Sequence, residues 1–182
     1  MRVILLYGSP HKYGSSNTLT EIFLEGLTSQ KEFIITRYYL NELDIHYCHG
    51  CLYCATSENH TCKIQDDMQP IYADFKRADL VVIATPMYWG YMTGIMKVTF
   101  DRFESLAWEG LYGKLIVAII TYHNHYESFV SFFERIAPHF HLTMHYLICC
   151  TLDKKIDKDI HVNNFPENLE EAYELGTKIG LY

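Results

Sequence analysis

The sequence is poor in positive charge and has no long apolar run. Its 15 lysines and arginines are outnumbered by 22 aspartates and glutamates, so the formal net charge is −7. A nucleic-acid-binding protein needs a basic face to displace the counterions of the phosphate backbone, which argues against this class. No apolar stretch reaches the 18 residues or so of a membrane-spanning helix. We therefore expect a cytoplasmic protein that binds neither nucleic acid nor membranes.

Internal repeats, low-complexity tracts and linkers are also missing. A length of 182 residues suits one domain, and 49 % apolar residues are enough for a substantial core. We expect residues 1–182 to form a single domain. Cytosolic thiols stay reduced, so disulfides are disfavoured for the six cysteines.

Continuous apolar runs alternate with amphipathic stretches along the chain. Apolar runs without polar alternation indicate strands buried on both faces, as in a parallel sheet. The stretches between them place apolar residues at helical spacing. This order predicts a doubly wound α/β fold with helices on both faces of a five-stranded parallel sheet. The strands are expected at 2–7, 33–40, 79–84, 115–120 and 142–149. The helices are expected at 17–29, 67–78, 93–107, 126–137 and 167–180.

The segment after the first strand has the composition of an anion site. Ligands bind such sheets at the carboxyl ends of the strands, so the segments after residues 7, 84 and 120 matter most. The first is GSPHKYGSSNT, which runs into a helix. A helix N-terminus offers free N–H groups and the positive end of the dipole, and the hydroxyls add donors. The segment is neither G-x-G-x-x-G nor a P-loop, and an ordinary loop with a helix cap is the alternative.

The segment TPMYWGYMTG, residues 85–94, places large side chains where turns are commonly small and polar. Packing between neighbouring loops would explain them, and so would a flat ligand that lies against them. Pro86 fixes the backbone, and Gly90 lets main-chain groups approach a ligand closely. A phosphate at one loop and a flat heteroaromatic ring at the next predict a mononucleotide such as FMN.

Three motifs in order, GSP…SSNT, CHGCLYC…C…DDM and ADLVVIATPMYWGYMTGIMKVTFDRF, span roughly residues 1–105. Together they resemble the NADPH-dependent FMN reductase superfamily of flavodoxin-like proteins, of which the iron–sulfur flavoproteins are one branch. The resemblance implies strand order 2-1-3-4-5, bound FMN, NAD(P)H as co-substrate, and a homodimer or homotetramer. It implies that the FMN phosphate contacts Ser9, His11, Ser15, Ser16, Asn17 and Thr18. It implies that the isoalloxazine lies along Pro86, Met87, Tyr88, Trp89 and Gly90.

The loop TYHNHYE, residues 121–127, departs from the family because it lacks the glycines that relatives often place beside the flavin. We expect Tyr122 and His123 to contact the ring or its substrate instead. Backbone N–H groups of residues 87–90 are expected to set the polarity around the ring. No nucleophile–base pair is evident, so no catalytic residue is predicted. The predicted function is the FMN-dependent transfer of a hydride from NAD(P)H to a small acceptor, such as a quinone, a flavin, a nitro-compound or an azo-compound.

Four cysteines lie close together, and their role has three alternatives. The spacing Cys48-x2-Cys51-x2-Cys54, with Cys62 nearby, resembles the run that holds a [4Fe–4S] cluster. Zinc more often uses two separated cysteine pairs. Reduced structural or redox-active thiols are the third alternative, because many reductases of the superfamily carry a similar loop without a demonstrated cluster. A cluster would favour a second function, an electron carrier with a ferredoxin-type partner, and a binding-only sensor is a third.

Other reactive residues receive structural interpretations. Cys149 and Cys150 end a buried strand and are expected in the core, and the histidines show no metal-binding pattern. Asp101 and Arg102 lie one turn beyond Lys97 on the predicted third helix. An ion pair within the helix or a tether from the helix to a loop is therefore expected of them, rather than chemistry.

Overall fold

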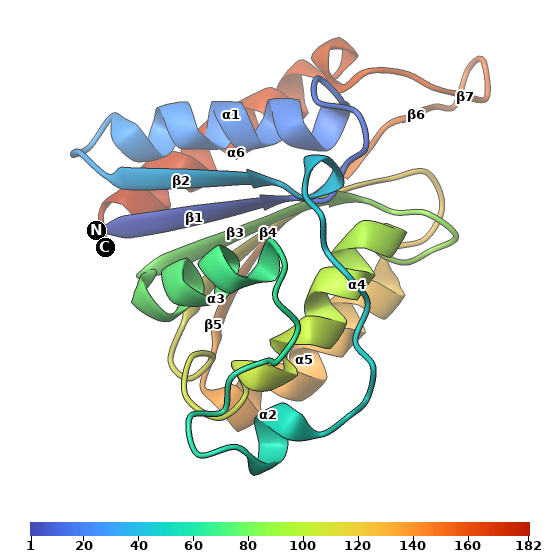
Figure 1. Ribbon diagram of the computed structural model, residues 1–182. Helices are drawn as coiled ribbons and strands as arrows, with labels where there is room; N and C mark the ends of the chain where they lie inside the picture. Colours follow the sequence, from blue (N-terminus) through green and yellow to red (C-terminus); the bar gives the residue numbers. More distant parts are fainter.

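A five-stranded parallel sheet forms the centre of the computed structural model, which describes residues 1–182 (Figure 1). Its strand order is β2-β1-β3-β4-β5, and every neighbouring pair is parallel, which confirms the predicted fold class. A short antiparallel pair, β6–β7, follows the sheet and was not predicted. The strands are β1 Arg2–Tyr7, β2 Ile34–Tyr39, β3 Leu80–Pro86, β4 Leu115–Tyr122, β5 Thr143–Cys150, β6 Leu152–Asp153 and β7 Lys158–Asp159.

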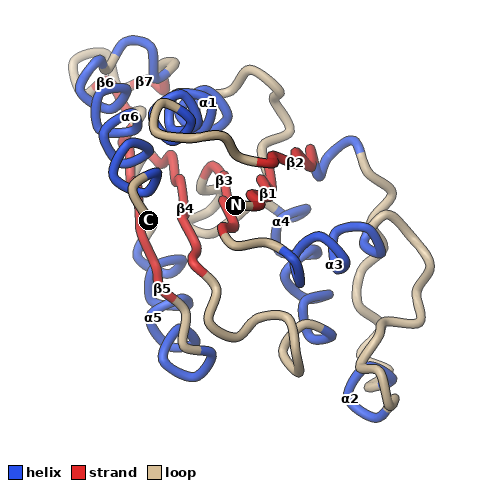
Figure 2. The backbone as a smooth tube through the Cα atoms, turned by 90° about the vertical axis from the view of Figure 1, so that its left-hand side faces the viewer, coloured by secondary structure: helices blue, strands red, loops and turns tan.

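Helices cover both faces of the sheet, as Figures 1 and 2 show. Helices α1 (Ser15–Thr28) and α6 (Pro166–Gly180) pack on one face, over a cluster of 17 buried residues. Helices α3 (Met68–Arg77), α4 (Gly94–Arg102) and α5 (Glu127–Phe140) cover 20 buried residues on the other. Alternate side chains of each strand point to opposite faces, which explains why the strands are apolar at every position. None of the helices is long and apolar enough to span a bilayer.

The helices α1 and α6 meet with their backbones in contact. A Cβ atom on Gly176 would lie 2.0 Å from the carbonyl oxygen of Phe23, and one on Gly26 would lie 2.1 Å from that of Tyr173. Both positions therefore require glycine. The contact holds the C-terminal helix against the helix that follows the first strand.

Three predicted helix boundaries differ from the structure by two residues or more, one of them the end of α5, which lies at Phe140 and not at residue 137. The helix expected at 93–107 ends at Arg102 and continues as the 3₁₀ turn η2 (Phe103–Ser105), and the Tyr72 hydroxyl donates to the Arg102 carbonyl at 3.0 Å. The helix expected from residue 17 begins at Ser15. The remaining short elements, which were not predicted, are η1 Leu40–Glu42, α2 Tyr53–Thr56 and η3 Val162–Asn164.

Candidate functional site

A cavity of about 820 Å³ lies at the carboxyl edge of the sheet. The loops after β1, β3 and β4 line it, as expected for ligand sites of parallel sheets, and the segment after β5 closes it. Most of the predicted cofactor residues are on its wall: Ser9, His11, Ser15, Ser16, Pro86, Met87, Tyr88, Trp89, Tyr122 and His123.

The loop after β1 presents unpaired donors to the cavity. Helix α1 begins after Gly14 without a side-chain cap and without an acidic residue in its first turn. Its first backbone hydrogen bond runs from the Thr18 N–H to the Gly14 carbonyl, so the N–H groups of residues 15–17 have no backbone acceptor. Lys12 adds a positive charge, held over the Tyr39 ring at 4.6 Å. This end of the cavity suits a phosphate.

Asn17 and Thr18 stay off the cavity wall because their side chains are engaged elsewhere. The Asn17 amide nitrogen donates to the carbonyls of His11, at 3.4 Å, and Lys12, at 3.1 Å, and so shapes the loop from behind. Its Oδ1 is buried without a partner. The Thr18 hydroxyl lies 3.4 Å from Nε2 of His161. The structure therefore places both residues as supports for the loop, and the phosphate contacts predicted for them stay untested.

The loop after β3 is a tight turn that displays an aromatic side chain. Tyr88 and Tyr91 exchange backbone hydrogen bonds of 2.7 and 3.1 Å across Trp89 and Gly90. Both central residues have positive φ, 53° and 74°, which is typical of a type I′ turn. Trp89 is fully exposed in this strained backbone. Gly90 faces His125 and lies off the cavity wall, and the ring contact predicted for it stays untested.

Of the N–H groups predicted to tune a bound ring, two are already used. Met87 donates to the Thr121 carbonyl at 2.8 Å, and Tyr88 donates to Tyr91. The N–H groups of Trp89 and Gly90 have no protein acceptor. Only these two donors of the turn are available to a ligand.

The far wall contains residues that the sequence analysis missed. Nε2 of His123 lies 2.9 Å from Oδ1 of Asp159, which joins the loop after β4 to β7. Nε2 of His161 lies 3.0 Å from the Tyr13 carbonyl, and the Val162 N–H donates to Ser15 Oγ at 3.1 Å. The segment after β5 thus reaches back to the start of α1. Since β5 is also parallel, its carboxyl end lies on the same edge, and that rule would have found the segment.

Comparison with known proteins assigns the chain. The family model described as NADPH-dependent FMN reductase matches residues 1–131. The chain belongs to this family. An iron–sulfur flavoprotein of Clostridioides difficile is 31 % identical over 126 residues, which are 68 % of this chain and 55 % of that protein. One of Archaeoglobus fulgidus is 29 % identical over 102 residues, 56 % of this chain and 45 % of its own. The chain thus spans about half the length of the curated relatives that it matches.

Solved structures share the fold of this FMN reductase family member. An azoreductase from Bacillus anthracis superposes with a TM-score of 0.76 at 16 % identity. The superposition covers 98 % of this chain and 99 % of the azoreductase. An NAD(P)H:quinone oxidoreductase from Methanothermobacter marburgensis gives 0.69 at 17 % identity, with 98 % of each chain covered. An archaeal flavodoxin gives 0.57 at 14 % identity, and covers all of this chain with 97 % of its own. These likenesses support the flavodoxin-like fold.

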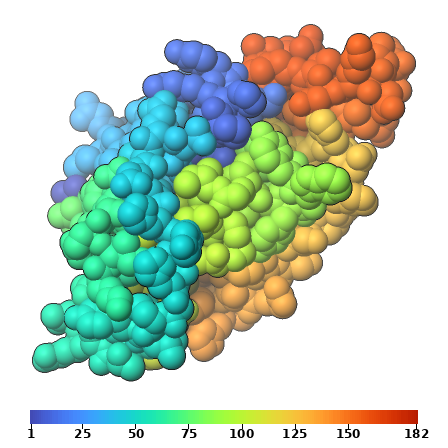
Figure 3. All heavy atoms as spheres, turned by 45° about the vertical axis from the view of Figure 1, so that its right-hand side comes forward, coloured from blue at the N-terminus to red at the C-terminus, as the bar shows by residue number.

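The cysteine-bearing segment, residues 47–65, projects from the body of the molecule (Figure 1; teal in Figure 3). Cys48 and Cys51 are exposed, whereas Cys54 and Cys62 are half-buried. Burial, followed by the nearby charge of Glu104, raises the pKa of the Cys54 thiol and favours its protonated form. No three histidine, cysteine or acidic side chains of the chain form a group that would hold a metal. The cysteines as placed here do not fit a cluster or a zinc ion.

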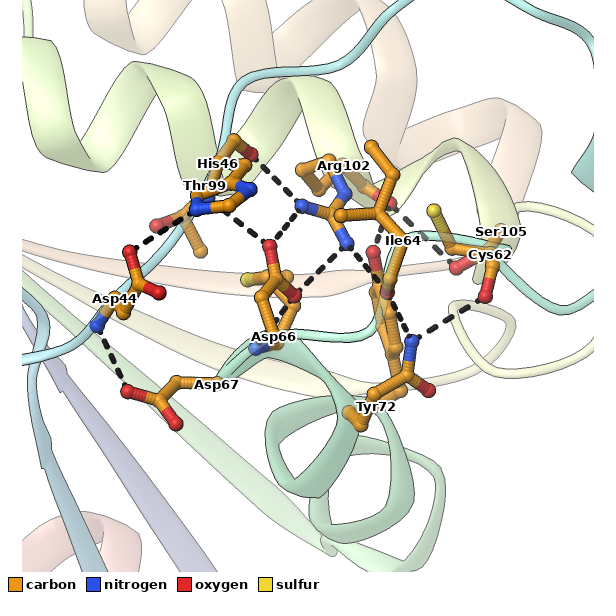
Figure 4. Close-up of polar contacts among 12 residues, drawn as sticks. Asp44, His46, Cys62, Ile64, Asp66, Asp67, Tyr72, Thr99, Arg102 and Ser105 are labelled. Carbon is orange, nitrogen blue, oxygen red and sulfur yellow. Dashed lines mark hydrogen bonds and ion pairs between the residues drawn. The ribbon is translucent and has the colours of Figure 1, made fainter.

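A buried ion pair fixes the base of this segment (Figure 4). Arg102, the last residue of α4, donates to Asp66 from both terminal nitrogens, at 2.6 and 3.1 Å, and both side chains are fully buried. It also donates to the carbonyl of His46, at 2.7 Å. Burial alone would favour a neutral Asp66, but hydrogen bonds from Arg102 and from backbone N–H groups hold the pKa of Asp66 below its usual value.

Three further expectations can be compared with the structure. Arg102 tethers the helix to the cysteine-bearing segment, and Lys97 pairs with Asp101 one turn away, so both structural interpretations are confirmed. Cys149 is buried in the core as expected. Cys150 is only half-buried, because it ends β5 at the cavity edge, where its thiol lies 3.7 Å from the His123 carbonyl.

Proposed function

We propose that this chain is an FMN-dependent NAD(P)H oxidoreductase whose acceptor is a small molecule. One observation carries the proposal: a single cavity joins unpaired helix N–H groups to an aromatic turn in a member of the NADPH-dependent FMN reductase family. FMN, when bound, supplies two-electron redox chemistry that the side chains of the protein lack. The protein provides placement and polarity.

The phosphate of FMN would occupy the end of the cavity formed by residues 9–16. The free N–H groups at the start of α1 would donate to the phosphate oxygens, and the hydroxyls of Ser15 and Ser16 would add donors. Lys12 would supply the charge, since it is the only lysine or arginine on the wall. Tyr39 and Glu42, which lie 4.6 and 3.6 Å from its ammonium, hold it in place.

The isoalloxazine would occupy the end formed by residues 86–89 and the loop after β4. Pro86, Met87 and Tyr88 offer apolar and aromatic area, while the Trp89 and Gly90 N–H groups would donate to polar atoms of the ring. Tyr88 lies on the cavity wall and about half of its surface is exposed, so a planar acceptor could stack there. Quinones, flavins, nitro-compounds and azo-compounds share this shape. We also propose a homodimer or homotetramer in the cytoplasm.

Titration of the purified protein with FMN tests the proposal. We expect FMN to bind with quenching of its fluorescence, and NAD(P)H to bleach the absorbance of the bound flavin. Lys12→Ala should weaken FMN about tenfold, the size of one partly exposed charge-assisted contact, and leave riboflavin binding unchanged. Lys31→Ala is the matched control, because Lys31 also lies over an aromatic ring, Phe33, but before β2 and away from the cavity. Failure of FMN to bind would refute the function.

A second candidate is an iron–sulfur flavoprotein that carries electrons to or from a ferredoxin-type partner. It is favoured by the spacing of Cys48, Cys51, Cys54 and Cys62 and by the relatives named iron–sulfur flavoproteins. Against it stands that no three of these side chains form a group that would hold a metal. Iron and acid-labile sulfide near four per chain in anaerobically purified protein would support it. A metal-free yellow protein that oxidises NADPH rapidly would exclude the electron carrier and support the oxidoreductase.

A further inference from the structure

A histidine–carboxylate pair lies on the cavity wall opposite the start of α1. His123, in the loop after β4, and Asp159, in β7, both line the cavity, with 2.9 Å between Nε2 and Oδ1. Their side chains are 45 % and 59 % exposed, so solvent and a ligand both reach them. Sequence distance hid this pair, because its members are brought together only by the parallel pairing of β4 with β5.

The pair fixes which nitrogen of the imidazole carries a proton. A carboxylate only accepts, so the neutral ring holds its proton on Nε2, toward Asp159, and Nδ1 has no protein partner. A proton added at Nδ1 turns this nitrogen into a donor while Nε2–H still faces Asp159. The free nitrogen is therefore the one that can donate to a bound molecule.

Other titratable groups around His123 do not replace it. Burial, and then the neighbouring Cys150, raises the pKa of Tyr122, so its phenol stays protonated at neutral pH. The Cys150 thiol points to the His123 carbonyl from the end of β5. His125 is not on the cavity wall, and its Nδ1 lies 3.8 Å from a carboxylate oxygen of Glu127.

We propose that His123 is a catalytic proton donor to the acceptor and that Asp159 is its positioning residue. This inference rests on the proposed function. Reduction of a quinone by NAD(P)H consumes a quinone, an NAD(P)H and a proton, and yields a hydroquinone and NAD(P)⁺. The hydride of NAD(P)H brings two electrons and one proton. The second proton passes from Nδ1 of His123 to a quinone oxygen, which breaks an N–H bond and forms an O–H bond, and the exposed ring regains a proton from water.

Two acceptors with different proton needs test the assignment. In His123→Gln, we expect reoxidation by benzoquinone to slow about 100-fold more than the bleaching of bound FMN by NADPH does, within the usual range for a lost general acid. Ferricyanide takes electrons without a proton, so the ratio of the benzoquinone rate to the ferricyanide rate should fall by about the same factor. His125→Gln, in the same loop, is the matched control.

The tautomer gives a measurement independent of turnover. In ¹⁵N spectra of the FMN-free protein, neutral His123 should carry its proton on Nε2, and Asp159→Asn should release this preference and slow benzoquinone less than His123→Gln does. Equal effects of His123→Gln on benzoquinone and ferricyanide, or none on either, would overturn the inference while FMN binding and reduction by NADPH leave the proposed function standing. A protein that binds no FMN would fail the proposed function first, a distinct result.

Discussion

The two ends of helix α4 hold their surroundings in opposite ways. At its start, Thr93 caps the helix, and its hydroxyl donates to the Gly8 carbonyl at 2.7 Å, which joins the loops after β3 and β1 by a neutral hydrogen bond. At its end, Arg102 forms a fully buried ion pair with Asp66. The start adjoins a cavity with unpaired N–H groups, whereas the end leaves only Arg102 Nε without a partner.

This difference shows how one helix serves a ligand site and a fixed segment. The free N–H groups at the cavity can bond to water, so they cost the protein little stability when no ligand is bound. Buried charges at the other end are stable only while both partners are present. We therefore expect damage at the cavity end to reduce binding and damage at the Arg102 end to reduce stability.

Removal of the Arg102 charge should have the largest effect. Arg102→Met leaves Asp66 buried without its partner, which typically costs about 3–5 kcal/mol of unfolding free energy. Urea unfolding measures the loss. The double variant Arg102→Met with Asp66→Leu should recover part of it, because no charge is then buried, although the N–H groups of His46 and Met68 lose their acceptor. Equal stability of Arg102→Met and the parent would contradict the buried pair.

Acid should weaken the same pair, by less than truncation does, because a protonated Asp66 is no longer a stranded charge. The pKa of Asp66 is lower in the folded protein, so its contribution is complete above the unfolded aspartate value of about 3.9 and is lost as the pH falls further. Urea midpoints of the parent and of the double variant should therefore converge below about pH 4. A constant difference down to pH 3 would refute this assignment.

Thr93→Val should reduce stability less than Arg102→Met does, but it should reduce FMN affinity more. The variant keeps the shape of the side chain but leaves the Gly8 carbonyl without its donor, a loss of about 1–2 kcal/mol. Since this bond joins the loops at the two ends of the cavity, FMN affinity should fall as well. Thr93→Ser, which keeps the hydroxyl, is the control for unfolding and fluorescence titration. An unchanged FMN affinity in Thr93→Val would show that the hydrogen bond from Thr93 to Gly8 does not contribute to FMN binding.

Trp89→Gly should give the smallest change in stability, and of opposite sign. The backbone at φ 53° suits glycine, and the exposed indole packs against nothing, so we expect a gain of about 0.5–1 kcal/mol. FMN or acceptor binding should weaken because stacking area is lost. A less stable variant would show that the indole is packed in solution. Trp108→Gly, outside the cavity and at ordinary φ, is the comparison.

Local patterns predicted the strands and the tether at Arg102, but not its partner. Continuous apolar runs revealed the buried strands because every position of a covered strand is apolar. Spacing placed Arg102 on α4, yet Asp66 lies 36 residues earlier and is brought close only by packing. The left-handed backbone of Trp89 could not be predicted either, because bulky residues other than glycine rarely adopt a positive φ. The spacing of the cysteines showed that they could form a metal site, but it could not show whether the fold brings them together.

The family pattern ends at residue 131, whereas Thr151, Asp159, Ile160 and His161 of the cavity wall come later. The residues proposed to bind FMN and most of those on the facing wall therefore belong to different stretches of the sequence. We expect paralogues with similar first halves to retain one prosthetic group and to diverge in the molecules they reduce. Exchange of residues 151–161 between such proteins would transfer that preference.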